Sequence, residues 1–64
     1  MITIRLSTDN AAFRNDDGSV NHFAIETVVK QAQDKLIDML ANRQEDQRIF
    51  DSNGNTIGHI CIRL

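Results

Sequence analysis

The sequence predicts an α+β domain with the element order β-α-β-β, in which a three-stranded, mainly antiparallel sheet packs against one amphipathic helix. Three observations lead to this prediction. Apolar and polar residues alternate at the start of the chain, apolar residues recur at helical spacing through the middle, and an Asn-Gly turn separates two short apolar runs near the end. With 64 residues the chain has the length of one small domain, residues 1–64.

The opening residues 2–7 are predicted to form a strand with one buried face. Ile2, Ile4 and Leu6 alternate with threonine, arginine and serine, so the three aliphatic side chains fall on the same side. The opposite side of this strand carries polar residues and is expected to face solvent.

Residues 8–21 are predicted to be a loop, because aspartate, asparagine, glycine and serine dominate their composition. Phe13 is the large aromatic residue within this loop, and we expect it to anchor the loop to the core. The residues just before Phe13 suit a short helical turn, with Asn10 or Asp9 as its cap.

A single helix is predicted from His22 to about Arg43, with Asn21 or Ser19 as its N-cap. At about 100° per residue the apolar side chains of this segment fall within one arc, whereas Ile37 lies outside it. Ile37 is therefore expected either at the margin of the buried face or exposed for a partner. The apolar arc consists of Ile25, Val28, Val29, Ala32, Leu36, Met39 and Leu40.

Two further strands are predicted on either side of a hairpin turn. The first covers residues 47–51 and the second residues 56–64, and Asn53-Gly54 between them is typical of a type I′ turn, whose two central residues need positive φ. Ile57 is out of phase with the alternation in the last strand. A bulge at Gly58-His59 is expected to return Ile57 to the apolar face.

The last strand is the longest and most apolar, so we expect it in the centre of the sheet, in the order 1-3-2 with antiparallel neighbours. The order 1-2-3, which needs a right-handed parallel crossover, is the alternative. In either order the helix covers one face of the sheet and leaves the other open. We expect a partner or a second subunit to dock on that open face or at the two sheet edges. The side chains expected on the open face are Thr3, Arg5, His59, Cys61 and Arg63.

Composition favours a small binding protein over an enzyme, because a core this thin leaves little room for a pocket of roughly 300–1,000 Å³. The formal net charge is −2, from 7 basic and 9 acidic residues, which does not favour direct nucleic-acid binding. The single cysteine excludes an intramolecular disulfide. No signal peptide or membrane-length apolar segment is visible, so the cytoplasm is the expected compartment.

The chain contains no group of residues that predicts catalysis, a cofactor or a metal site. His59 and Cys61 share one side of a strand, but a zinc site needs three or four ligands and only His22 could join them. Residues two apart on a strand are separated by about 6–7 Å, too far for a direct hydrogen bond between a nucleophile and its base. The spacing that starts at Asp51 fails as a calcium loop at its sixth and twelfth positions.

Acidic residues are the candidate partner-binding residues. They occur in the loop and along the helix, where such residues are most often simply a solvated surface. If they act together, they favour a partner with a basic surface. The candidates are Asp16, Asp17, Glu26, Asp34 and Asp38.

Two segments resemble those of a class of small bacteriophage and prophage proteins, most of which have no assigned function. Thr8-Asp9-Asn10-Ala11-Ala12-Phe13 follows the first strand, and Asp51-Ser52-Asn53-Gly54-Asn55-Thr56-Ile57-Gly58 lies at the closing hairpin. The class shares the layout of an opening strand, one amphipathic helix and a closing hairpin along the whole chain. Its helix is more acidic and richer in arginine, and the segment before that helix is shorter than here.

The resemblance implies a phage or prophage origin more than a particular activity. Small phage proteins of this length include many that inhibit a host complex by binding it, among them anti-CRISPR proteins, which are short, often acidic and usually not enzymes. The leading hypothesis is therefore an inhibitor of a host defence complex, such as a CRISPR effector, that acts by protein–protein contact in the host cytoplasm. The alternative hypothesis is a structural or assembly protein that forms a homodimer through its open sheet face.

Overall fold

The computed structural model describes all 64 residues and confirms the predicted α+β architecture. Strand β1 (Ile2–Leu6) is followed by a short 3₁₀ helix η1 (Ala11–Phe13), the helix α1 (His22–Asn42), and the strands β2 (Asp46–Phe50) and β3 (Thr56–Ile62). The strands form one sheet in the order β1-β3-β2, and both neighbouring pairs are antiparallel. The last strand is therefore central, as predicted, and the alternative order 1-2-3 is wrong.

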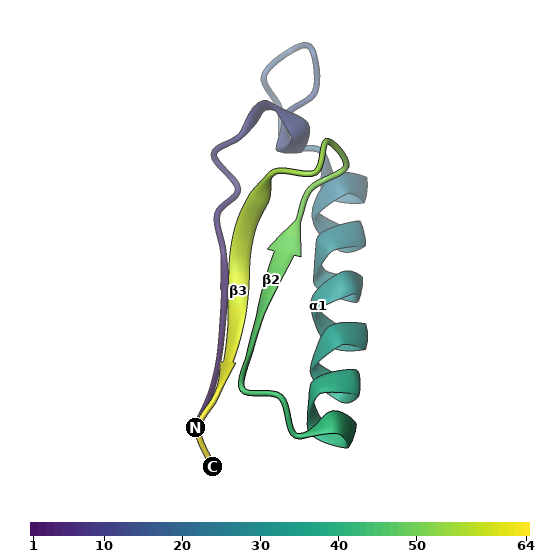
Figure 1. The fold of residues 1–64 in the computed structure, drawn as a ribbon. Helices are drawn as coiled ribbons and strands as arrows, with labels where there is room; N and C mark the ends of the chain where they lie inside the picture. The colour runs from purple at the N-terminus through teal and green to yellow at the C-terminus, as the bar shows by residue number, and fades with distance from the viewer.

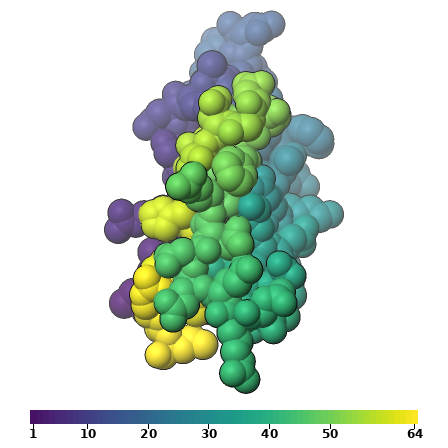
Figure 2. All heavy atoms as spheres, viewed as in Figure 1, coloured from purple at the N-terminus to yellow at the C-terminus, as the bar shows by residue number.

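The molecule is elongated, with principal extents of 42 × 19 × 15 Å (Figure 2). In Figure 1 the two termini lie together at one end, and the loop between η1 and α1 projects at the other. The predicted boundaries of the strands differ from the observed ones by one or two residues. The structure contains no helix that combines the length and the apolar character needed to span a membrane.

An asparagine side chain caps the N-terminus of each helix. The Asn10 Oδ1 atom accepts a hydrogen bond from the Ala12 N–H at 2.7 Å, and the Asn21 Oδ1 atom accepts one from the Ala24 N–H at 3.1 Å. The helix α1 ends at Asn42 and is followed by the C-cap residue Arg43, which has a left-handed backbone conformation with a φ of 55°. Of the caps that the sequence allows, the structure thus selects Asn10 and Asn21.

The hairpin turn between β2 and β3 differs from the predicted type I′ turn. Gly54 has a φ of 82°, but Asn53 does not have a positive φ. The Asp51 N–H donates to the Asn55 carbonyl, so the loop is three residues long and needs only its last residue in the left-handed region. The type I′ prediction is wrong because it assumes a loop of two residues.

The bulge in β3 lies one residue before its predicted position. Ile49 pairs with Gly58 and Phe50 pairs with Thr56, so Ile57 is the extra residue of β3. Ile57 is buried in the core. The bulge therefore has the predicted effect, which is to return this residue to the apolar face of the sheet.

The core lies between α1 and the part of the sheet formed by β2 and β3. Phe13 belongs to it and anchors the loop after β1, as predicted. The four largest side chains that are fully buried come from η1, α1, β2 and β3, so each of these elements contributes to one core. The buried apolar cluster consists of Phe13, Val28, Ala32, Met39, Ile49, Ile57, Ile60 and Ile62.

The apolar face of β1 is only half-buried, contrary to the prediction. Ile2 and Ile4 remain 44% and 42% exposed, although Ile62 and Ile60, their partners on β3, are buried. The physical reason is the lateral position of α1, which packs most closely against β2 and η1 and runs along the β2 side of the sheet (Figure 1). One edge of the apolar sheet face is therefore left without a cover.

Because α1 lies toward the β2 side of the sheet, only part of its predicted apolar arc is buried. Val28, Ala32 and Met39 are buried against the sheet, whereas Val29 and Leu40 are 49% and 46% exposed. Val29 and Leu40 lie on one flank of the helix, at about 100° per residue. Part of the arc that the sequence assigns to the core is therefore surface.

Candidate functional site

The open face of the sheet carries a row of three basic side chains. Arg5 on β1 pairs with His59 on β3, and His59 pairs with Arg48 on β2, so the three residues lie side by side across the sheet. All three are exposed, and none of them belongs to either ion pair of the structure. We refer to Arg5, His59 and Arg48 as the basic row.

The neighbouring row across the sheet consists of Thr3, Cys61 and Asp46. The Asp46 carboxylate lies 3.4 Å from Arg63 Nη2, and the other nitrogen of this guanidinium, Nη1, lies 3.5 Å from the Glu45 carboxylate. Both carboxylates are thus paired with Arg63. The positive charge of the basic row has no ion-pair partner in the protein itself and is available to a ligand.

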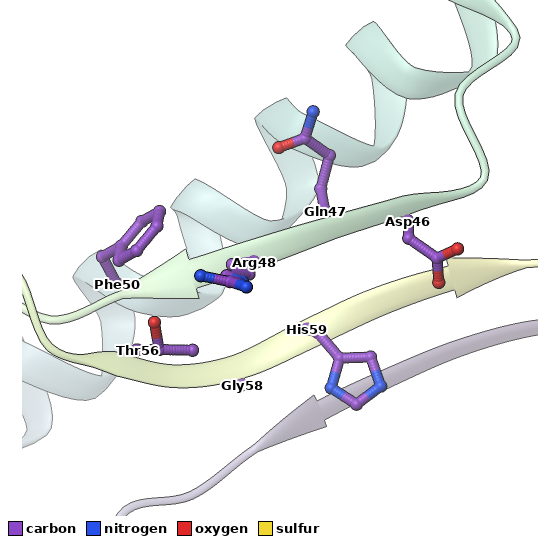
Figure 3. A pocket seen from close by; sticks show the side chains of 7 residues that line it. All are labelled: Asp46, Gln47, Arg48, Phe50, Thr56, Gly58 and His59. Carbon is purple, nitrogen blue, oxygen red and sulfur yellow. The ribbon is translucent and has the colours of Figure 1, made fainter.

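A hollow of about 510 Å³ lies on the sheet beside the basic row. Figure 3 shows that Gln47 and Phe50 point away from β3, whereas His59 extends toward β1. Lys35 Nζ lies 4.9 Å from the centre of the Phe50 ring, which favours a fixed orientation of this partly exposed aromatic side chain. The hollow is lined by Asp46, Gln47, Arg48, Phe50, Thr56, Gly58 and His59.

Two of the five acidic candidates, Asp16 and Asp17, lie in the loop that projects between η1 and α1. The Asp17 carboxylate accepts hydrogen bonds from the Ser19 N–H at 2.9 Å and from the Ser19 hydroxyl at 2.6 Å. The side-chain bond from Ser19, and after it the backbone bond, lower the pKa of Asp17. Asp17 therefore already has a local role in holding the turn.

The other three acidic candidates are exposed on α1 and do not form one patch. Glu26 and Asp38 are twelve residues apart, about 18 Å along the helix, and they lie on different sides of it. Asp34 and Asp38 share one side, and the Asp38 carboxylate accepts a hydrogen bond from the Asn42 side chain at 3.1 Å. The structure thus spreads the predicted acidic site over the loop and two sides of the helix.

The histidine and cysteine residues do not gather into a metal site. His59 and Cys61 both lie on the open face, two residues apart on β3, while His22 is the first residue of α1. The structure contains no group of three or more His, Cys, Asp or Glu side chains that could hold a metal ion.

The segments of residues 8–13 and 51–58 meet at the buried carboxylate of Asp51. It accepts a hydrogen bond from the Asn10 side chain at 2.6 Å and one each from the Asn53 and Asn55 N–H groups at 2.9 Å. Burial raises the pKa of Asp51, but these hydrogen bonds, with the Asn55 backbone bond first, outweigh that effect and leave the pKa below its usual value. Both segments therefore contribute to the fold, because Asp51 joins the hairpin to the cap of η1.

Replacing Asp51 with asparagine is expected to lower the stability at neutral pH and to remove part of its pH dependence. The folded state depresses the pKa of Asp51, so the carboxylate stabilises the fold above the unfolded pKa of about 3.9, and this stabilisation is lost as the pH falls through the folded pKa. The difference in urea midpoint between the wild type and Asp51→Asn should therefore shrink at acidic pH.

Urea unfolding over a pH series measures this effect, and Asp9→Asn is the matched control because Asp9 is exposed. Because Asp9 is exposed, the control should stay within about 0.5 kcal/mol of the wild-type stability at neutral pH. A constant difference between wild type and Asp51→Asn at every pH would contradict the assigned role of the ionised carboxylate.

The basic row depends on strand register and cannot be predicted from the sequence alone. Alternation along the first and last strands places Arg5 and His59 on the open face, but Arg48 joins them only through the register of β2 against β3. One local indication exists, because Arg48 directly precedes the apolar Ile49 and must point to the opposite side of the strand. The register itself depends on contacts far apart in the sequence.

No protein-family model, no curated protein and no solved structure matches this chain. The basic row and the adjoining hollow are a surface suited to binding, since they combine exposed basic side chains with a partly exposed aromatic ring on the sheet.

Proposed function

We propose that the protein is a small binding protein of phage or prophage origin that inhibits a host defence complex, such as a CRISPR effector, by contact in the host cytoplasm. The observation that supports a binding role is the basic row, which has no paired carboxylate and lies next to Phe50. Arginine and aromatic side chains contribute most of the binding energy in many protein interfaces. The resemblance of the two segments to phage proteins supports a host protein as the partner.

The charge of the basic row favours an acidic patch on the partner. This is the opposite of the basic partner surface that the acidic residues of the sequence suggest. The five acidic residues are dispersed, whereas Arg5, His59 and Arg48 are adjacent in the sheet. The basic row is therefore the better candidate for the contact surface.

Charge reversal separates the two surfaces. The double variant Arg5→Glu/Arg48→Glu should abolish inhibition and weaken the affinity for the target about 100-fold, because each of two contributing arginines accounts for roughly 1.4 kcal/mol. The matched control is Asp34→Lys/Asp38→Lys, which also reverses two exposed charges and should retain inhibition. The readout is the plating efficiency of a CRISPR-targeted phage on cells that express each variant.

Three outcomes would count against the proposal. Undiminished CRISPR interference in cells that express the wild type would show that the protein does not inhibit this system. Loss of inhibition in the aspartate variant alone would show that the acidic residues, and not the basic row, contact the target. If the wild type shifts single-stranded RNA or DNA in a gel and Arg5→Glu/Arg48→Glu does not, the basic row binds nucleic acid and not a protein. Circular dichroism of each variant shows whether the fold is retained.

A further inference from the structure

The two edges of the sheet differ in whether side chains of the protein bind their outward backbone groups. At the β2 edge, the Gln31 side chain donates to the Phe50 carbonyl at 2.8 Å and accepts from the Phe50 N–H at 2.9 Å. Lys35 Nζ donates to the Arg48 carbonyl at 2.8 Å. Side chains of α1 thus occupy the Phe50 N–H and C=O groups and the Arg48 C=O group on the outer side of β2, and they hinder pairing of this edge with another strand.

The β1 edge has no such protection. The Arg63 N–H donates to the Met1 carbonyl and the Ser7 N–H donates to the Ile57 carbonyl, so the odd-numbered residues direct their backbone groups toward β3. Hydrogen bonds in an antiparallel ladder alternate, so the N–H and C=O groups of the even-numbered residues point outward. These residues are Ile2, Ile4 and Leu6, and no strand lies beyond them.

An uncovered apolar strip accompanies this open edge. It consists of Ile2 and Ile4 on β1 and of Val29 and Leu40 on α1, all between 42% and 49% exposed and none of them charged. The flank of α1 that carries Gln31 and Lys35 faces β2, so the opposite flank, with Val29 and Leu40, lies toward β1. Apolar surface that runs beside a free strand edge is typical of an interaction site.

A second hollow, of about 430 Å³, continues this strip at one end of the molecule. Leu40, Met39, Ile62 and Leu64 contribute its apolar lining. Ile62 is the register partner of Ile2, so the hollow lies beside Ile2, one of the two β1 residues of the strip. The strip therefore offers a concave surface as well as an exposed one.

We infer that the β1 edge binds a second copy of this chain and joins the two sheets into one continuous antiparallel sheet. In the register that pairs the whole strand, Ile4 lies opposite Ile4 of the second copy and Ile2 lies opposite Leu6. These are the residues whose backbone groups point outward, so each of the three pairs can exchange two hydrogen bonds. The side chains that meet on the apolar face are then all aliphatic.

The open face of the joined sheet is also compatible with this register. Thr3 of each copy lies opposite Arg5 of the other, so no arginine faces an arginine directly. The register therefore pairs the backbone groups of both strands without placing like charges directly opposite each other, and the same residues serve both copies, as in a two-fold symmetric interface.

The apolar strip explains why the occupant is a second copy and not an unrelated strand. A two-fold axis perpendicular to the sheet places both α1 helices on the same face and turns their Val29–Leu40 flanks toward each other. An unrelated strand would satisfy the outward backbone groups but would bring no second apolar flank. The inference goes beyond the proposed function, since the basic row lies on the opposite face and stays accessible in the dimer.

The oligomeric state tests this inference directly. Sedimentation equilibrium of the full chain should give a mass of twice 7.2 kDa at high micromolar concentration. Ile4→Lys should weaken the dimer about 100-fold or more, because a symmetric interface contains the buried charge twice. Ile37→Lys is the matched control, since Ile37 is 61% exposed on the outer side of α1, and it should leave the mass unchanged. A wild-type mass of 7.2 kDa up to millimolar concentration, or equal effects of the two variants, would overturn the inference.

Cross-linking tests the register without relying on a charged substitution. In a Cys61→Ser background, which removes the single native thiol, Ile4→Cys should form a disulfide-linked dimer on mild oxidation, because opposed strand residues have Cα atoms about 5.5 Å apart. Ile37→Cys in the same background should not. Equal rates of cross-linking at the two positions would show that the contact is random collision and would reject the β1 interface. Neither variant alters the basic row, so failure here is distinguishable from failure of the proposed function.

Discussion

Replacing Gly58 with alanine is expected to remove most of the folding stability of the protein. A β carbon at this position would stand 1.9 Å from the carbonyl oxygen of Arg5 and 2.9 Å from its carbonyl carbon. Both atoms belong to the backbone of β1, which is held in the β1–β3 ladder and cannot move aside without breaking it. We expect a loss of about 3 kcal/mol or more, against a total stability of roughly 3–5 kcal/mol for a domain of this size.

Urea unfolding followed by far-UV circular dichroism measures this loss. The matched control is Gly54→Ala, because Gly54 has a φ of 82° but no atom within 4 Å of an added β carbon. Its cost should be only that of a left-handed alanine, about 1–2 kcal/mol. If Gly58→Ala were no more destabilising than Gly54→Ala, the close approach of β1 and β3 would not be a constraint on this fold.

Replacing Phe13 with alanine is expected to destabilise the protein by about 3–5 kcal/mol, which is comparable to its whole stability. Phe13 is 1% exposed and is the contribution of η1 to the apolar core. Its removal leaves a cavity beside Ala24 and Val28 of α1, which line the same region, and releases the loop after β1. The expected result is a large fall in the urea midpoint or an unfolded variant.

Phe23→Ala is the control for the Phe13 substitution, since it deletes the same side chain from a position that is 77% exposed. We expect its stability to stay within about 0.5 kcal/mol of the wild type. Equal losses in the two variants would mean that the loop is not anchored through Phe13. The slope of the urea transition should be the same in every folded variant, since the surface exposed on unfolding hardly changes.

Local patterns in the sequence are enough to predict the type and order of the elements. Alternation in β1 and β3, the helical arc of α1 and the two asparagine caps depend on residues within a few positions of each other, and all of them appear in the structure. The strand order follows from the apolar character of the last strand, which suits the position buried between two neighbours.

The hairpin turn and the bulge show how local prediction reaches its limit. The Asn-Gly pair correctly places the turn, but the loop length depends on the hydrogen bonds that the Asp51 carboxylate and backbone make with Asn53 and Asn55. The acidic candidates show the same limit on a larger scale. A list of charges along the chain does not say whether they share a surface, and here five carboxylates are dispersed over the loop and the helix.

Which residues share a side within each strand and helix can be read from local patterns, because backbone periodicity is a local property. How those sides combine depends on the packing of the elements against one another. The register of β2 and β1 against β3 brings Arg5, His59 and Arg48 into one row, and the displacement of α1 toward β2 leaves Ile2 and Ile4 uncovered. Register and lateral packing arise from contacts between residues far apart in the chain, and both candidate interaction surfaces of this protein are consequences of those contacts.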